Sequence, residues 1–164
     1  MTKIKYLLIC FIIILLLPTT AFASTNIEQE DWQDIRLSDE EFEQLLSQNS
    51  NNELIPFASN LISSKAISIS KKDNTLLIIG RTDCNNMVTK CGFSKVTIQR
   101  RKNSSSSWTT YKSYTDLYAN SSIYKLAKSL SVPTGYQYRV TCTHYAKSST
   151  KSQSINNTSN TVTF

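Results

Sequence analysis

The sequence predicts an all-β sandwich of seven strands behind an N-terminal extension, and three observations carry this prediction. From residue 66 onward, apolar side chains recur at every second position, the period of a strand with one buried face. Turns rich in Ser, Asn and Gly interrupt this pattern at roughly even intervals. The one good helical pattern lies in the N-terminal extension, at residues 37–52.

The strand candidates follow one another along the chain. The first two, AISISK at 66–71 and TLLIIGRTD at 75–83, are joined by a turn. The second is nearly all apolar, which suits a strand buried on both faces or over most of its length. The others are 91–101, 108–115, 123–132, 136–145 and a last strand through Val162 and Phe164. The expected core consists of Ile67, Ile69, Leu76, Ile78, Val96, Ile98, Leu126, Leu130, Val132, Tyr138, Val140 and Val162.

The stretch SVPTGYQYRV at 131–140 resembles the start of strand F in fibronectin type III-like and immunoglobulin-like domains. In those domains a tight turn precedes a Tyr that hydrogen-bonds back to the chain, the tyrosine corner. The resemblance implies this role for Tyr138, with Tyr136 as second candidate. It also implies the strand order A, B, C, C′, E, F, G. A fold of this kind is shared by many functions and assigns none.

A second resemblance rests on KCGFSKVTIQRRKNSSSSWTTYKSYTD and GYQYRVTCTHYAK. These segments look like a family of small secreted proteins of Gram-positive bacteria with no assigned function, and the similarity covers residues 80–164. Such proteins have a signal peptide, a poorly similar N-terminal part and this β domain. The resemblance implies the compartment and the domain boundary, and it supplies no catalytic residues.

The first 23 residues have the pattern of an export signal. Lys3 and Lys5 precede the apolar run YLLICFIIILLLP, and AFA at 21–23 is a small-x-small cleavage site before Ser24. The alternative, a membrane anchor, is disfavoured because the apolar run is short for a spanning helix. We therefore expect a chain without a membrane anchor that is secreted and extracellular, or loosely associated with the cell wall.

Residues 24–64 are expected to form an acidic extension and linker, and residues 65–164 the β domain. In the extension, LSDEEFEQLLSQNSNN predicts a short helix with a capping box of Ser38 and Glu41. Because the β domain has a core of its own, we expect the extension to be dispensable for folding.

Charge is divided unevenly along the chain. Residues 24–60 hold nine acidic residues against one basic, a net charge of −8, whereas residues 61–164 hold fifteen basic against three acidic, a net of +12. This asymmetry indicates a polyanionic neighbour, attraction between the two parts, or a solvated basic surface. The candidate basic and aromatic surface comprises Arg100, Arg101, Lys102, Trp108, Lys112 and Tyr114.

Cys142 and the only histidine, His144, share one face of a strand. At a rise of about 3.3 Å per residue, we expect them about 7 Å apart, which is too far for a catalytic hydrogen bond. A packed Cys and a half-buried His are expected instead. The assumed strand order makes Cys91 and Cys142 the possible disulfide, with Cys84 free. Cys84 and Cys91 lack zinc-pair spacing, so no metal site is expected.

Three functions stay open at this point. The first is a non-enzymatic binding module for a cell-wall polyanion, a carbohydrate or a protein. The second is a secreted regulator or inhibitor that docks through the acidic segment. The third is an enzyme such as a hydrolase, which is disfavoured because the β domain shows no paired carboxylates and no nucleophile motif. We expect a monomer with no cofactor and no nucleic-acid partner.

Overall fold

The computed structural model describes residues 32–49, 53–54 and 60–164. The expected signal peptide, the cleavage site before Ser24 and most of the linker lie outside these residues. Among the described residues, no helix combines the length and apolarity needed to cross a bilayer.

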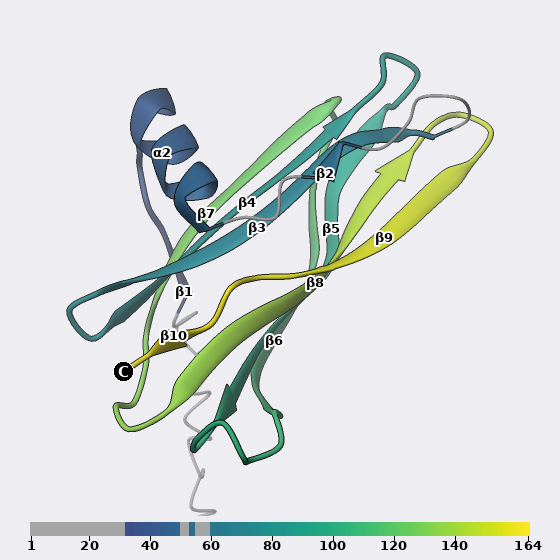
Figure 1. Ribbon diagram of the computed structural model, residues 1–164. Coiled ribbons are helices and arrows are strands. Elements are labelled where there is room, and N and C mark those ends of the chain that lie inside the picture. Colours follow the sequence, from purple (N-terminus) through teal and green to yellow (C-terminus); the bar gives the residue numbers. More distant parts are fainter. Residues whose placement is uncertain (1–31, 50–52, 55–59) are drawn as a thin grey trace, which may run out of the picture.

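Two antiparallel sheets make up the structure, which confirms the all-β sandwich (Figure 1). One sheet has the order β1–β7–β4–β3–β2. Its strands are β1 (Trp32–Asp34), β2 (Glu53–Leu54), β3 (Ile62–Lys72), β4 (Thr75–Cys84) and β7 (Ile123–Ser131). We call it the β4 sheet.

The second sheet, the β8 sheet, has the order β10–β8–β5–β6, with β9 also paired to β8. Its strands are β5 (Lys90–Arg101), β6 (Thr109–Ala119), β8 (Gln137–Lys147), β9 (Ser152–Thr158) and β10 (Val162–Thr163). The expected last strand is therefore divided into β9 and β10, and both pair with the same neighbour.

The main core lies between the sheets, as the alternation of apolar residues predicts. All the predicted core residues belong to it except Val162, which is partly buried and packs against it. Phe93, Cys142 and Phe164 are further members that the sequence analysis did not include. Burial of each large apolar side chain contributes about 2 kcal/mol before chain entropy is subtracted.

The helix α2 (Asp39–Asn49) covers the outside of the β4 sheet (Figure 1). The capping box is confirmed: the Glu41 amide donates to the Ser38 hydroxyl at 3.2 Å, and the Ser38 amide donates to the Glu41 carboxylate at 2.9 Å. Phe42 and Leu46 pack on Ala66 and Ile79. The helix explains why β4 is nearly all apolar, since its two faces are both covered.

The described part of the acidic extension contributes the strands β1 and β2 to the sandwich, whereas the extension was expected to be dispensable for folding. Trp32 in β1 is 3% exposed, lies in the main core and contacts Tyr114, with ring centroids 3.8 Å apart and ring planes tilted by 43°. The strand β3 also begins at Ile62, before the expected boundary at residue 65. A three-residue strand is too short to show alternation, so its pairing with β7 could not be recognised from the sequence.

Amide side chains from the C-terminal segment of the β8 sheet bind the part of the β3 edge that β2 does not pair. Asn160 accepts a hydrogen bond from the Ile69 amide and donates one to the Ile69 carbonyl, both at 2.9 Å. Gln153 accepts from the amides of Leu61 and Ile62 at 2.7 and 2.9 Å. These bonds occupy backbone groups that an unpaired edge would offer to another chain.

Candidate functional site

A row of three buried side chains, Thr82, His144 and Cys142, joins the two sheets through hydrogen bonds. The Thr82 hydroxyl on β4 lies 2.7 Å from Nδ1 of His144 on β8, and Nε2 of His144 lies 3.5 Å from Sγ of Cys142. The expected separation of about 7 Å between Cys142 and His144 is therefore wrong. That estimate used strand rise alone, whereas the imidazole ring leans along the strand toward the sulfur.

The donor and the acceptor of each hydrogen bond in this row follow from the number of hydrogens that each side chain carries. The Thr82 hydroxyl donates to the Gly92 carbonyl at 3.3 Å, so it accepts from His144 Nδ1–H. His144 Nε2 is then the acceptor for the Cys142 thiol. In this arrangement every polar hydrogen of the Thr82, His144 and Cys142 side chains has a partner. We assign the His144 tautomer on these hydrogen-bond grounds.

Burial keeps both titrating groups neutral. Burial, followed by the charge of Lys65, lowers the pKa of His144 to about 3, and burial raises the pKa of Cys142 to about 12. A cysteine nucleophile needs the opposite shifts, because the thiolate is the reactive form. The arrangement therefore acts as a structural hydrogen-bond network.

The register of β5 against β8 does not place Cys91 opposite Cys142, the pair expected from the strand order. Cys91 lies opposite Ala146, and Cys142 lies opposite Val96, so the two cysteines are several residue pairs apart along β8. The Cys91–Cys142 disulfide is therefore wrong, because two cysteines need Cα atoms within about 7 Å to bond. The two strands are antiparallel neighbours, as assumed, but their register differs from the assumed one.

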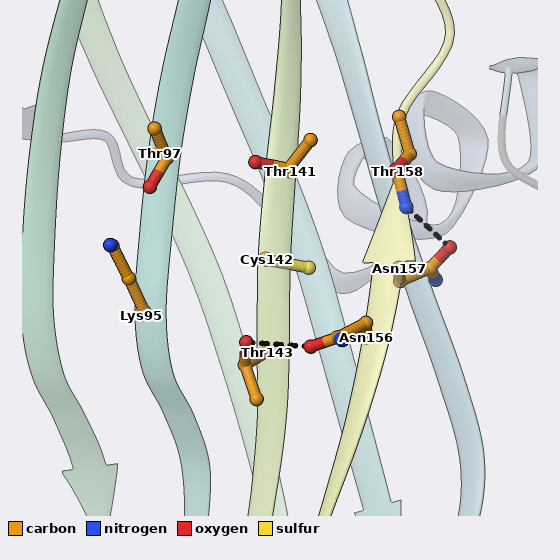
Figure 2. Close-up of a pocket in the computed structure, with 8 residues that line it drawn as sticks. All are labelled: Lys95, Thr97, Thr141, Cys142, Thr143, Asn156, Asn157 and Thr158. Carbon is orange, nitrogen blue, oxygen red and sulfur yellow. Dashed lines mark hydrogen bonds between the residues drawn. The ribbon is translucent and has the colours of Figure 1, made fainter. Parts of the chain in front are cut away.

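The outward side of the β8 sheet carries a groove of about 340 Å³ (Figure 2). Because Val96 and Val140 face the core, their neighbours Thr97 and Thr141 face outward. Thr97, Thr141 and Thr158 form one cross-strand row. The lining residues are Lys95, Thr97, Thr141, Cys142, Thr143, Asn156, Asn157 and Thr158.

A second cross-strand row of the groove adds a cation and an amide. Lys95 is paired with Thr143, and Thr143 with Asn156. The Thr143 hydroxyl donates to the Asn156 side-chain oxygen at 2.9 Å (Figure 2). The groove is thus a hydroxyl-rich and amide-rich surface with one exposed lysine at its side.

Trp108 is contacted by two guanidinium groups at one end of this face. Arg101 and Arg139 sit 4.4 and 4.5 Å from the indole ring. Their Nε atoms donate to Gln137 and Gln99 at 2.7 and 2.8 Å, which holds both groups in place. Within the described part of the chain, neither guanidinium has a carboxylate partner. The result is an ordered, uncompensated pair of positive charges.

Two tyrosines and a lysine form the other end of the face. Tyr118 and Tyr145 flank Gly92 on neighbouring strands, with ring centroids 5.1 Å apart, and Lys90 lies 4.4 Å from the Tyr118 ring. Gly92 has φ of +154°, and a Cβ there would approach the Leu117 carbonyl oxygen to 2.0 Å. Only glycine allows the strands to meet in this way.

We call the whole surface, from the Arg101–Trp108–Arg139 cluster through the groove to Tyr118 and Tyr145, the outer β8 face. Tyr145 lies six positions after Arg139 on β8, so the face is about 20 Å long. Arg101 and Trp108 belong to the candidate surface predicted from the sequence, and the structure brings them together. Arg139 was not predicted, although its alternation with Val140 and Thr141 was the available signal.

The remaining members of the predicted surface lie elsewhere. Arg100 lies 4.7 Å from the rings of both Tyr111 and Tyr136, and Lys102 lies 5.1 Å from Tyr136. Tyr114 packs against Trp32 and the core. Lys112 is opposite the inward-facing Ile98 in the register. The predicted surface is thus divided, because alternation sends neighbours in a strand to opposite faces.

The two outer faces of the sandwich differ in how their cations are paired with carboxylates. Lys125 and Arg81 on the outer side of the β4 sheet pair with Asp39 and Glu43 at 2.8 and 2.6 Å. A third pair, Lys128 with Asp34 at 2.9 Å, lies on the inward-facing side of the same sheet, beside Trp32. The strands of the β8 sheet contain one acidic residue, Asp116. The extension therefore neutralises one face and leaves the other basic.

Comparisons of the chain with protein-family models, with curated proteins and with solved structures found no match.

Proposed function

We propose that this protein is a secreted, non-enzymatic binding module whose outer β8 face holds an anionic polymer of a cell wall or another surface. The observation that carries the proposal is the segregation of charge between the two faces. Acidic side chains of the extension pair with cations of the β4 sheet, whereas Arg101, Arg139 and Lys95 on the outer β8 face have no such partners among the described residues.

The shape of the face also supports an extended ligand. A polymer lying along β8 would contact the two guanidinium groups, then the groove, then the tyrosine pair. Guanidinium groups bind phosphate and carboxylate groups through paired N–H donors, and threonine and asparagine hydrogen-bond to hydroxyl groups. Trp108 and the tyrosines offer flat apolar surfaces for sugar rings.

The alternative of a regulator that docks through its acidic segment has less support. Asp34, Asp39 and Glu43 already pair within the chain, and Phe42 and Leu46 of the same segment are buried. A partner would have to displace these contacts.

We also infer that the sandwich is of the fibronectin type III-like kind. Two observations support this inference: the order β7–β4–β3 opposite β9/β10–β8–β5–β6, and the Tyr138 hydroxyl, which donates to the Pro133 carbonyl at 2.8 Å. The resemblance to secreted Gram-positive proteins suggests a bacterial cell wall as the first ligand to test.

The test is sedimentation of the full chain with purified Gram-positive cell wall at low and high salt. Salt shortens the screening distance from about 10 Å at 0.1 M to about 3 Å at 1 M, so binding should fall steeply. The double variant Arg101→Gln with Arg139→Gln should bind at least about tenfold more weakly, a loss of about 1.4 kcal/mol.

Lys72→Gln is the matched control, because Lys72 is exposed at the β3–β4 turn, away from this face. It should bind like the parent chain. Salt-insensitive binding that is lost in Trp108→Ala would identify an uncharged glycan as ligand instead. Equal weakening by Lys72→Gln would show that net charge, and not this face, determines binding.

A further inference from the structure

Cys84 and Cys91 meet where the chain passes from one sheet to the other. Cys84 is the last residue of β4, and Cys91 is the second residue of β5. Cys91 belongs to a small apolar cluster, separate from the main core, against which Cys84 also packs. The other buried members of the cluster are Leu61, Ile62, Val88 and Ala146.

The two thiols pack in the same cluster and differ in exposure. Cys91 is fully buried and its Sγ donates to the Thr82 carbonyl at 3.3 Å, while Cys84 is partly exposed. The Cys84 thiol is hydrogen-bonded to the Cys91 sulfur, which raises the pKa of Cys84 and lowers that of Cys91. One cysteine is thus reachable from solvent, and the other lies behind it as the better thiolate.

We propose that Cys84 and Cys91 are a redox pair that forms a disulfide across the β4–β5 connection, by exchange with a small-molecule or protein disulfide outside the cell. The bond would close a short loop over residues 85–90 and fasten the two sheets to each other at this end of the sandwich. Cys142 takes no part.

The exchange balances with a disulfide as oxidant. The Cys84 sulfur, once its proton has left, attacks one sulfur of the oxidant and forms a mixed disulfide, releasing one oxidant thiolate. The Cys91 thiolate then attacks the Cys84 sulfur and releases the second oxidant thiolate. The two protons from Cys84 and Cys91 end on the released thiolates. Two electrons pass from the cysteine pair to the oxidant, which leaves as two thiols.

Cys142 is excluded by its position. It is 4% exposed, and its sulfur lies against His144. A disulfide cannot reach a thiol that is enclosed in the core, whereas the Cys84 thiol is partly exposed. The odd cysteine of the described chain therefore stays reduced inside the core.

The test is peptide mapping of the native full chain after treatment with oxidised glutathione. Remaining thiols are alkylated before the chain is unfolded, and trypsin then cuts after Arg81, Lys90 and Lys95. The expected product is the peptide 82–90 joined to the peptide 91–95, with two hydrogens lost. Dithiothreitol should separate the two peptides.

Several results would overturn the proposal. These are alkylated Cys84 and Cys91 after oxidation, a glutathione adduct on Cys84 that never resolves, and a linkage to Cys142. A linked peptide that forms only after the chain is unfolded would also overturn it, because the proposal requires the native contact.

Variants separate this pairing from general oxidation. Cys142→Ser should give the same linked peptide, whereas Cys84→Ser should give none. Oxidation should raise the Tm of the parent chain by about 10 °C, since the bond closes a loop of about eight residues. The Tm of Cys84→Ser should not respond to oxidant. An equal rise in Cys84→Ser would show that oxidation acts somewhere else.

Discussion

The hydroxyl of Thr82 and Nδ1 of His144 lie 2.7 Å apart, and this contact joins the two sheets inside the core. Both residues are fully buried, at 0% exposure. The same threonine also touches β5, because its hydroxyl donates to the Gly92 carbonyl. A single side chain thus satisfies polar groups from two strands of the opposite sheet.

Replacing Thr82 by Val should destabilise the fold. Valine has the same shape but leaves the His144 N–H and the Gly92 carbonyl without their partner. An unsatisfied buried polar group costs about 1–3 kcal/mol, and we expect a loss in this range on urea unfolding. Thr141→Val, on the outward face of β8, is the control and should change stability by less than about 0.5 kcal/mol. Equal effects of the two variants would contradict the network.

Because of His144, the free energy of unfolding should decrease as the pH is lowered below 6.5. Folding lowers the pKa of its imidazole from 6.5 to about 3, so between these values the unfolded chain binds a proton that the native chain does not. The contribution is therefore fully present above pH 6.5 and is lost as the pH falls toward 3. At pH 5 the loss is about 2 kcal/mol, from about 1.4 kcal/mol per pH unit.

Two measurements check this pH dependence. The NMR shift of the His144 ring protons should stay constant from pH 7.5 to about pH 5 in the native chain, and a midpoint near 6.5 would contradict the assignment. Urea unfolding of His144→Gln should lose the extra slope between pH 6.5 and 5. Carboxylates such as Asp39 and Glu41 titrate in both chains, so their contribution cancels in the difference.

Trp32 should be among the most important residues for stability, although it lies in the acidic extension. Trp32→Ala removes a core side chain and its contact with Tyr114, and should cost about 3–5 kcal/mol. Gln33→Ala, at the next and exposed position, should have little effect. A chain that begins at Leu61 should lose far more stability than Gln33→Ala, as measured by urea unfolding. Unchanged cooperative unfolding of that shorter chain would show that the extension is only an accessory.

Asn160 should protect the edge of β3. Asn160→Ala removes both hydrogen bonds to Ile69, so the Ile69 amide should exchange with solvent faster than in the parent chain. The amide of Ile67, which sits in the same strand, serves as the internal reference. Comparable exchange of Ile69 in both chains would mean that the side-chain bridge does not close the edge. Asn157→Ala, in β9, is the matched control.

Removing the Tyr138 hydroxyl should cost about 1 kcal/mol, the typical net value of one hydrogen bond. Tyr138→Phe keeps the ring in the core and loses only the bond to the Pro133 carbonyl. Tyr136→Phe is the comparison, since Tyr136 was the second candidate for the tyrosine corner. A larger effect of Tyr136→Phe on urea unfolding would assign the corner to that residue.

Alternation along the strands determined the sandwich, because burying one face of a strand needs an apolar residue at every second position. Ile67, Ile69, Val96 and Ile98 could therefore be assigned to the core from the sequence, and Ser38 with Glu41 identified the start of the helix. These features depend on residues that are neighbours in the chain, so local chemistry is enough to predict them.

Register and long-range contacts were decided only by the tertiary structure. The register of β5 against β8 separates Cys91 from Cys142. The packing of the two sheets brings Thr82 of β4 against His144 of β8. Trp32 reaches the core by pairing with β7, almost a hundred residues away. No sequence period records such contacts, because they depend on how two sheets pack and on the exact pairing of strands from distant parts of the chain.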